Sequence, residues 1–213
     1  MQWLMLLLAM VNPTPYEDPL MPHPSPPADF RSRELPTVSS KGTWYRLNDR
    51  DFMSSLYFDR SGSGRFDSPA QGYGILYVGA DVYASWIECY GRTHGARGIS
   101  EIVLRQRNLF AIDSHRELVF ADVTGNGLVK MGADARLSSG AYIAARQWAQ
   151  AIYDHPQAVD GIRYRSRHDD ERYCYGIFDR CADELREKNL GNLFDSNPKL
   201  LAEILSCYDY GLF

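Results

Sequence analysis

Residues 74–90, GILYVGADVYASWIECY, change from one hydrophobic pattern to another. Gly74–Val78 is a short apolar run of the kind found in buried strands. Beyond it, Val82, Trp86 and Tyr90 recur at helical spacing, which predicts a helix that turns these side chains toward a core. The stretch therefore predicts a strand followed closely by a packed helix.

Short apolar runs separated by Gly, Asp and Asn predict further strands on both sides of this stretch. Strands and helices do not alternate regularly along the chain, which disfavours a doubly wound parallel sheet and predicts a mixed α+β fold. The expected strands are Trp44–Asn48, Gly74–Val78, Glu101–Leu104, Leu118–Ala121, Gly161–Tyr164 and Tyr175–Phe178.

Two more helices are expected downstream. The clearer one runs from about Gly140 to His155, because apolar residues recur on one face and either Ser138 or Ser139 can cap its start. The last covers residues 199–208 and follows a proline, which suits the first turn of a helix.

The first forty residues differ from the rest in composition. Residues 1–11 are apolar but too few to span a bilayer. No Lys or Arg occurs before Arg31 and no A-x-A triplet follows the run, so a secretory signal is not expected. Residues 12–40 hold eight of the chain's 11 prolines, which block helix formation and strand pairing. We expect residues 1–40 to be an apolar start with a proline-rich flexible extension, and residues 41–213 to form the folded domain.

Length and composition narrow the class of protein. The chain has 213 residues, 45% hydrophobic and 23% charged, as in one globular domain. The net charge of -4 provides no basic field, so we expect no direct nucleic-acid binding, and no membrane partner is expected either. The four cysteines form no CxxC pair, which predicts reduced, mostly buried thiols and a cytoplasmic protein.

Three motif-like runs are better explained by local structure. GNGLVKMG at residues 125–132 lacks the spacing of a phosphate-binding loop and is predicted to be a turn. Ser166, His168 and Asp169 are too close in sequence to converge as a hydrolase triad. The acidic residues 169–171 have no further ligands at a fixed spacing, so no metal site is predicted.

Four segments together carry a more specific signal: WYRL at 44–47, GRFD at 64–67, the stretch from Gly74 to Glu88, and DGIRYRSR at 160–167. In this order they resemble the RES domain, the toxin of RES/Xre toxin–antitoxin pairs. The resemblance covers about residues 42–180. It implies a fold similar to that of ADP-ribosyltransferase toxins, with a mainly antiparallel sheet core and flanking helices. It also implies NAD⁺ cleavage between nicotinamide and ribose, and an Xre-type antitoxin as partner.

The resemblance also assigns roles to individual residues. Nicotinamide leaves NAD⁺ as a neutral molecule, so cleavage needs no general acid and one carboxylate suffices. NAD⁺ would be the substrate, with water or inorganic phosphate as acceptor, and no cofactor is expected. The implied roles are Glu88 as the catalytic carboxylate, Arg46 and Arg65 on the diphosphate, Tyr77 against nicotinamide, Ser166 hydrogen-bonded near the ribose or Glu88, and Tyr45 as a further contact.

Two alternatives stay open at this point. The same residues suit transfer of ADP-ribose to a macromolecule, for which Asp81 or Ser85 would bind the acceptor. A non-catalytic module that only binds a partner is the other alternative. The proline-rich extension is not part of the family core, so the resemblance assigns it no function.

Overall fold

A computed structural model describes residues 23–92 and 97–213, and its main feature is one curved sheet in the order β1-β6-β7-β8-β3-β2-β5-β9. Within this sheet only β6 and β7 pair in parallel, so the fold is α+β with a mainly antiparallel sheet, as predicted. Its strands are β1 (Thr37–Ser40), β2 (Trp44–Asp49), β3 (Ile75–Gly79), β5 (Arg107–Ser114), β6 (Leu118–Asp122), β7 (Gly161–Arg165), β8 (Tyr173–Phe178) and β9 (Leu185–Asn192).

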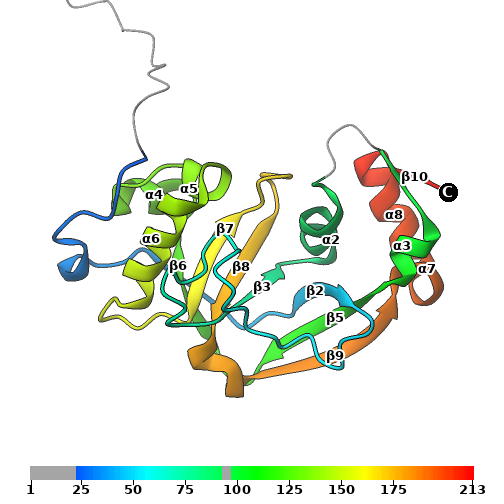
Figure 1. Ribbon diagram of the computed structural model, residues 1–213, viewed down its shortest axis with the longest axis horizontal. Helices are drawn as coiled ribbons and strands as arrows, with labels where there is room; N and C mark the ends of the chain where they lie inside the picture. Colours follow the sequence, from blue (N-terminus) through cyan, green and yellow to red (C-terminus); the bar gives the residue numbers. More distant parts are fainter. Residues whose placement is uncertain (1–22, 93–96) are drawn as a thin grey trace, which may run out of the picture.

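Helices gather at the two ends of this sheet, and one lies between them (Figure 1). α4, α5 and α6 stand near β6 and β7, α3, α7 and α8 lie at the β5 and β9 end, and α2 lies above β2 and β3. The helices are η1 (Phe30–Ser32), α2 (Val82–Tyr90), α3 (Glu101–Arg105), α4 (Gly125–Met131), α5 (Arg136–Ser139), α6 (Tyr142–Tyr153), η2 (Asp179–Glu184), α7 (Leu193–Ser196) and α8 (Pro198–Tyr208), and a small parallel pair joins β4 (Gly98–Ile99) to β10 (Gly211–Leu212).

Large aromatic side chains fill the core on both sides of α2. Trp148 of α6 is fully buried in a cluster that includes Phe66 and Phe178, whereas Trp86 of α2 is fully buried in a separate cluster with Ile204 of α8. α2 thus packs toward the C-terminal helix, while α6 packs against the opposite part of the sheet. The cleft described below is lined by residues from both of these packed regions.

The prediction of a strand at Glu101–Leu104 is wrong, because these residues belong to the short helix α3. The Ser100 hydroxyl accepts a hydrogen bond from the Val103 N–H at 3.3 Å, which caps the helix. Ile102 and Val103 are 66% and 39% exposed, so the apolar run does not mark a strand buried on both faces. A local cap outweighs the strand preference of β-branched residues here.

The two predictions around residues 125–140 also need correction. Residues 125–131 are helical rather than a turn, and Gly132 ends α4 with a φ of +83°, a conformation that favours glycine. α6 begins at Tyr142 rather than Gly140, and its N-cap is Ala141, without a capping side chain. Ser138 and Ser139 belong to the separate short helix α5.

The folded part begins earlier than the expected boundary at Lys41. β1 pairs antiparallel with β6, from Thr37 opposite Ala121 to Ser40 opposite Leu118. Phe30 is 4% exposed and belongs to the same core cluster as Trp148. The expectation that the prolines block strand pairing throughout this segment is therefore wrong, because Phe30–Ser32 form a short 3-10 helix and Thr37–Ser40 pair as a strand. Residues 1–22, including the apolar run at 1–11, lie outside the described residues.

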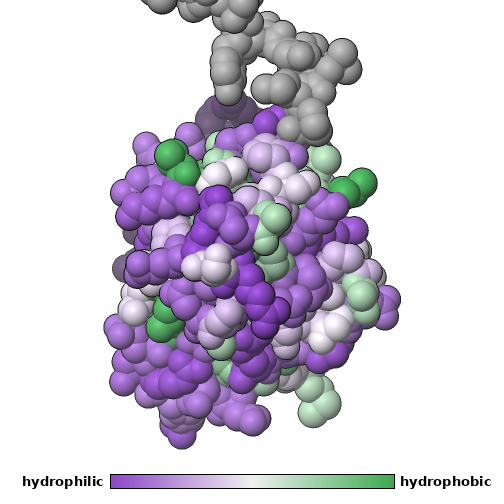
Figure 2. All heavy atoms as spheres, turned by 90° about the vertical axis from the view of Figure 1, so that its left-hand side faces the viewer, coloured by the Kyte–Doolittle hydropathy of each residue, from purple (hydrophilic) through white to green (hydrophobic). Residues whose placement is uncertain are grey.

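The surface around α4, α5 and α6 is mostly hydrophilic, with scattered apolar residues (Figure 2). Val129 on α4 and Ile143 on α6 are exposed examples. Among the described residues, no helix has both the length and the apolar character needed to cross a bilayer. Cys174 and Cys181 are buried free thiols as predicted, whereas Cys89 is partly buried and Cys207 is exposed.

Candidate functional site

A cleft of about 640 Å³ is lined by residues of α2, of the neighbouring strands β2 and β3, of the segment 59–65 and of the start of α6. This volume falls in the range of pockets that hold small molecules and cofactors. The lining comprises Tyr45, Arg46, Leu47, Asp59, Ser63, Gly64, Arg65, Tyr77, Val78, Gly79, Ser85, Glu88, Cys89, Arg92, Arg107, Ser138, Tyr142, Tyr164, Arg167, His168 and Cys174. The structure thus brings Tyr45, Arg46, Arg65, Tyr77 and Glu88 into one cleft.

Close contacts with β2 and β3 place α2 beside this cleft. A side chain at Gly79 would meet the Asp81 carbonyl oxygen at 2.8 Å, so glycine lets the chain fold back from β3 into the helix. The Ser85 hydroxyl accepts a hydrogen bond from the Leu47 N–H of β2 at 2.9 Å. These contacts fix the helix that carries Glu88.

Glu88 is held by a serine from another part of the chain. The Ser166 hydroxyl donates a 2.6 Å hydrogen bond to Glu88 Oε1, across 78 positions of sequence. Ser166 Oγ also accepts hydrogen bonds from the N–H groups of His168 at 3.1 Å and Asp169 at 3.3 Å. Because both lone pairs of the hydroxyl oxygen are used, its hydrogen is directed at the carboxylate.

Ser166 itself is 2% exposed and is not part of the cleft lining. Among the described residues, its side chain contacts Glu88 and the backbone of its own loop. Of the two contacts that the sequence suggested for Ser166, the structure contains the one with Glu88. Ser166 is therefore placed to orient the carboxylate rather than to present its own hydroxyl to the open cleft.

Tyr77 lines the cleft from β3, and its hydroxyl makes two hydrogen bonds within the protein. The hydroxyl donates to Asp67 Oδ1 at 2.7 Å and accepts from the Phe66 N–H at 2.9 Å. Burial, together with the charge of Asp67, raises the pKa of Tyr77 well above its ordinary value, so the hydroxyl stays protonated. A side chain at Gly64 would approach the Tyr77 hydroxyl oxygen to 2.7 Å, which explains glycine at that position.

Arg65 is a buried cation, and part of its guanidinium makes no hydrogen bond with a described residue. It is 7% exposed, and its Nη1 donates to the carbonyl oxygens of Gly140 at 2.7 Å and Leu137 at 3.3 Å. Its guanidinium lies 4.5 Å from the centroid of the Tyr142 ring. Burial lowers the pKa of Arg65, but the guanidinium remains charged. The buried Nη2 has no hydrogen-bond partner among the described residues.

Arg46 of β2 is partly buried and only weakly tied to its surroundings. Its Nη1 donates to the Tyr57 carbonyl oxygen at 3.3 Å. Burial lowers the pKa of Arg46, and the charges of Asp59 and Glu187 partly oppose this effect. The neighbouring Tyr45 lines the cleft and also packs against the core cluster that contains Trp86.

Three arginines that the sequence analysis gave no role also line the cleft: Arg92, Arg107 and Arg167. None of the five arginines in the lining makes an ion pair with a described residue. The acidic residues of the lining are Asp59 and Glu88. The cleft therefore has a surplus of positive charge and suits an anionic ligand.

Local sequence could have indicated part of this set. Arg92 follows Glu88 by four positions, near one helical turn, and Arg167 adjoins Ser166. Arg107 reaches the cleft because β5 pairs beside β2, which local sequence does not reveal. Among the described residues, no group of three or more His, Cys, Asp and Glu side chains could hold a metal ion.

Comparisons with known proteins agree with this architecture. The family model described as RES domain matches residues 43–196, more than half of the chain. A protein of Sinorhizobium fredii named probable toxin y4kH is 29% identical over 109 residues, covering 51% of this chain and 83% of that protein. A chain in the crystal structure of the M. tuberculosis MbcT-MbcA toxin-antitoxin complex matches with a TM-score of 0.57 and 17% identity, covering 80% of this chain and 92% of that chain. The chain therefore belongs to the RES-domain family.

Proposed function

We propose that this protein is a RES-family toxin that depletes NAD⁺ by cleaving the bond between nicotinamide and ribose. The observation that carries the proposal is the carboxylate of Glu88, held by the Ser166 hydroxyl in a cleft lined by five arginines without ion-pair partners among the described residues. Cleavage of a cationic leaving group needs one such carboxylate, and a diphosphate needs cationic donors.

In the proposed reaction the C–N bond between ribose and nicotinamide breaks, and its electron pair passes to the ring nitrogen, which becomes neutral. An oxygen of water or of inorganic phosphate then bonds to the anomeric carbon; a water molecule gives up a proton as it does so. Glu88 stabilises the positive charge that develops on the ribose. No residue has to protonate the leaving group.

The remaining residues bind and orient the substrate in this proposal. Arg46 and Arg65 contact the diphosphate, because guanidinium groups offer paired donors to phosphate oxygens. The ring of Tyr77 packs against nicotinamide, while its hydroxyl remains bonded to Asp67. Tyr45 provides a further contact, and Ser166 keeps the Glu88 carboxylate in its orientation.

Transfer of ADP-ribose to a macromolecule has less structural support. Asp81 caps α2 by accepting from the Ala84 N–H and forms an ion pair with Arg172 at 3.1 Å. Ser85 is bonded to the backbone of β2. Both side chains suggested for acceptor binding thus already have structural partners.

We propose an antitoxin protein of the Xre type as the partner. A RES domain in this chain, and a solved relative described as part of a toxin-antitoxin complex, support a neutralising partner. An acidic group or chain terminus of the partner placed near Arg46 and Arg65 would compete with the diphosphate.

The test is release of free nicotinamide from NAD⁺ by the purified protein, freed of any partner, with and without phosphate. Glu88→Gln keeps the shape of the side chain but removes its charge, so we expect kcat to fall by about 10²- to 10³-fold with NAD⁺ binding retained. Glu117→Gln makes the same change at an exposed position outside the cleft and should leave kcat unchanged.

The sugar product separates the two acceptors, because phosphorolysis yields a phosphorylated ADP-ribose and hydrolysis yields ADP-ribose itself. A Glu88→Gln variant that keeps turnover within a factor of about two would contradict the role given to Glu88. Absence of nicotinamide release in both buffers would shift the proposal to ADP-ribose transfer or to a partner-binding module.

A further inference from the structure

The loop between β7 and β8, residues 166–172, determines where the Ser166 hydroxyl lies. The Ser166 N–H donates to the Arg172 carbonyl oxygen at 3.0 Å, and the Arg172 N–H donates to the Asp169 carbonyl oxygen at 3.0 Å. The Asp169 N–H in turn donates to Ser166 Oγ. Moving Asp169 would therefore disturb the hydroxyl that orients Glu88.

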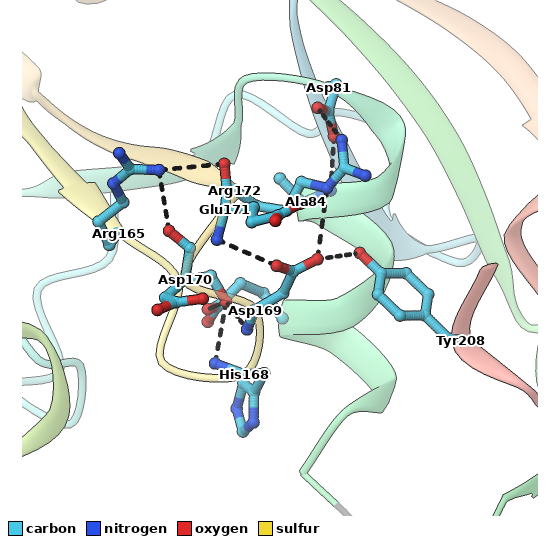
Figure 3. A network of polar contacts seen from close by, with 11 residues as sticks. Asp81, Ala84, Arg165, His168, Asp169, Asp170, Glu171, Arg172 and Tyr208 are labelled. Atoms are coloured by element: carbon cyan, nitrogen blue, oxygen red, sulfur yellow. Dashed lines mark hydrogen bonds and ion pairs between the residues drawn. The ribbon is translucent and has the colours of Figure 1, made fainter.

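The side chain of Arg172 connects this loop to the start of α2 (Figure 3). Its Nη1 lies 3.1 Å from Asp81 Oδ2, and its Nε lies 3.3 Å from Asp169 Oδ2. Asp81 is the N-cap of α2, and Glu88 lies in the last turn of the same helix. The loop thus holds α2 at both ends, through Arg172 at the cap and through Ser166 at Glu88.

A residue of the C-terminal helix α8 contacts both the loop and α2. The Tyr208 hydroxyl donates to Asp169 Oδ2 at 2.8 Å, and Figure 3 shows this bond beside the contact of Arg172 with the same carboxylate. The Tyr208 ring stacks on Trp86 of α2, with centroids 5.4 Å apart and an interplanar angle of 6°. Burial and the neighbouring Asp169 raise the pKa of Tyr208, which keeps its hydroxyl a donor.

Tyr208 lies outside the segment that defines the family, since the RES match ends at residue 196. We propose that Tyr208 is a positioning residue through which α8 holds Asp169, and hence the Ser166 hydroxyl, in the orientation that fixes Glu88. This inference rests on the proposed function for its effect on turnover. It gives α8, which lies beyond the matched residues 43–196, a role in orienting the Glu88 carboxylate.

The inference makes a specific kinetic prediction. Tyr208→Phe keeps the ring that stacks on Trp86 and removes only the hydroxyl bonded to Asp169. We expect kcat to fall roughly three- to tenfold, as for loss of one hydrogen bond, with KM nearly unchanged because Arg46 and Arg65 are not disturbed. Because partial unfolding would also lower the apparent kcat at constant KM, kcat is expressed per folded protein, with the folded fraction measured by circular dichroism on the same sample.

Tyr210→Phe is the matched control. The Tyr210 ring also contacts Trp86, at a centroid distance of 4.7 Å, but its hydroxyl makes no hydrogen bond with a described residue. This variant should retain the kcat of the native protein. A second control places Tyr208→Phe in a Ser166→Ala background, where the additional loss of kcat should disappear because the two residues act in series.

Amide hydrogen exchange tests the same inference without NAD⁺. The N–H groups of His168 and Asp169 bond to Ser166 Oγ, so their exchange should become faster in Tyr208→Phe and stay unchanged in Tyr210→Phe. Unchanged exchange in Tyr208→Phe would overturn the inference, as would an undiminished kcat. If the native protein releases no nicotinamide, the proposed function fails, and the exchange comparison alone decides whether Tyr208 positions the loop.

Discussion

At the scale of single residues, Arg46 and Arg65 differ in how firmly they are held. Arg65 donates to two carbonyl oxygens and stacks on Tyr142, so removing its side chain would also disturb the start of α6. Arg46 makes one long hydrogen bond, of 3.3 Å, to the Tyr57 carbonyl oxygen. Arg46 is therefore the better position at which to measure the contribution of a charge to ligand binding.

We expect Arg46→Gln to weaken NAD⁺ binding with little effect on folding. A hydrogen bond to a charged group is worth about 1.5–3 kcal/mol, which corresponds to a rise in KM of roughly ten- to a hundredfold. Steady-state kinetics of nicotinamide release would measure this change. Arg50→Gln removes an exposed arginine just beyond β2 and outside the cleft, so an equal rise in KM in that variant would count against the assignment.

At the scale of secondary-structure elements, α6 joins the proline-rich segment to the core. The indole N–H of Trp148 donates to the Pro24 carbonyl oxygen at 2.8 Å. The ring of Phe30 meets Trp148 edge to face, with centroids 5.2 Å apart. This packing explains why residues ahead of Lys41 are part of the folded domain.

Trp148→Ala should therefore destabilise the protein without changing the cleft. Trp148 is fully buried, and truncation of such a residue costs about 3–5 kcal/mol of the free energy of unfolding. Denaturant titration would measure the loss, and the folded fraction should keep its KM for NAD⁺. Gln147→Ala, at an exposed position of the same helix, should change stability by no more than about 0.5 kcal/mol.

At the scale of the whole molecule, charge is distributed unevenly. The chain carries a formal net charge of -4, yet five arginines line the cleft. An anionic ligand therefore meets a local positive field on a protein that is negative overall. A field confined to a cleft favours a small anion over an extended polyanion such as nucleic acid.

The junction of β6 and β7 gives the fold a predicted sensitivity to acid. Arg116 donates two 2.7 Å hydrogen bonds to Asp160, and the Val119 N–H donates a third at 2.8 Å. Burial opposes ionisation of Asp160, but these hydrogen bonds outweigh it and lower the pKa of the carboxyl. Its stabilising effect is thus present above the unfolded pKa of about 4 and is lost as the pH falls through the lower folded value.

Asp160→Asn should reduce the free energy of unfolding by about 1–3 kcal/mol at neutral pH. The difference from the native protein should shrink as the pH falls below about 4 toward the lower folded pKa of Asp160, because the unfolded state takes up the proton first. Thermal or denaturant unfolding at several pH values measures both effects. Asp183→Asn, at an exposed position without a hydrogen bond to a described side chain, serves as control, and a difference that stayed constant with pH would contradict the role of Asp160.

The sequence by itself determined the elements that carry strong local patterns. The strand at Ile75–Gly79, the helix after Asp81 and the final helix were predictable because hydrophobic periodicity and capping residues act within a few positions. Four short segments were also sufficient to place the chain near the RES family. By contrast, weak local patterns misled the prediction at Glu101–Leu104 and at residues 125–132.

Only the tertiary structure decided how distant residues act together. It contains the Glu88 contact of the two suggested for Ser166, brings Arg107 beside β2, and places Tyr208 of the last helix against Asp169. Each of these contacts arises because strands pair and helices pack across long stretches of chain, and no local pattern encodes such a partner. The sequence therefore determined which chemical groups are present, and packing decided which of them share the cleft and which hold it in shape.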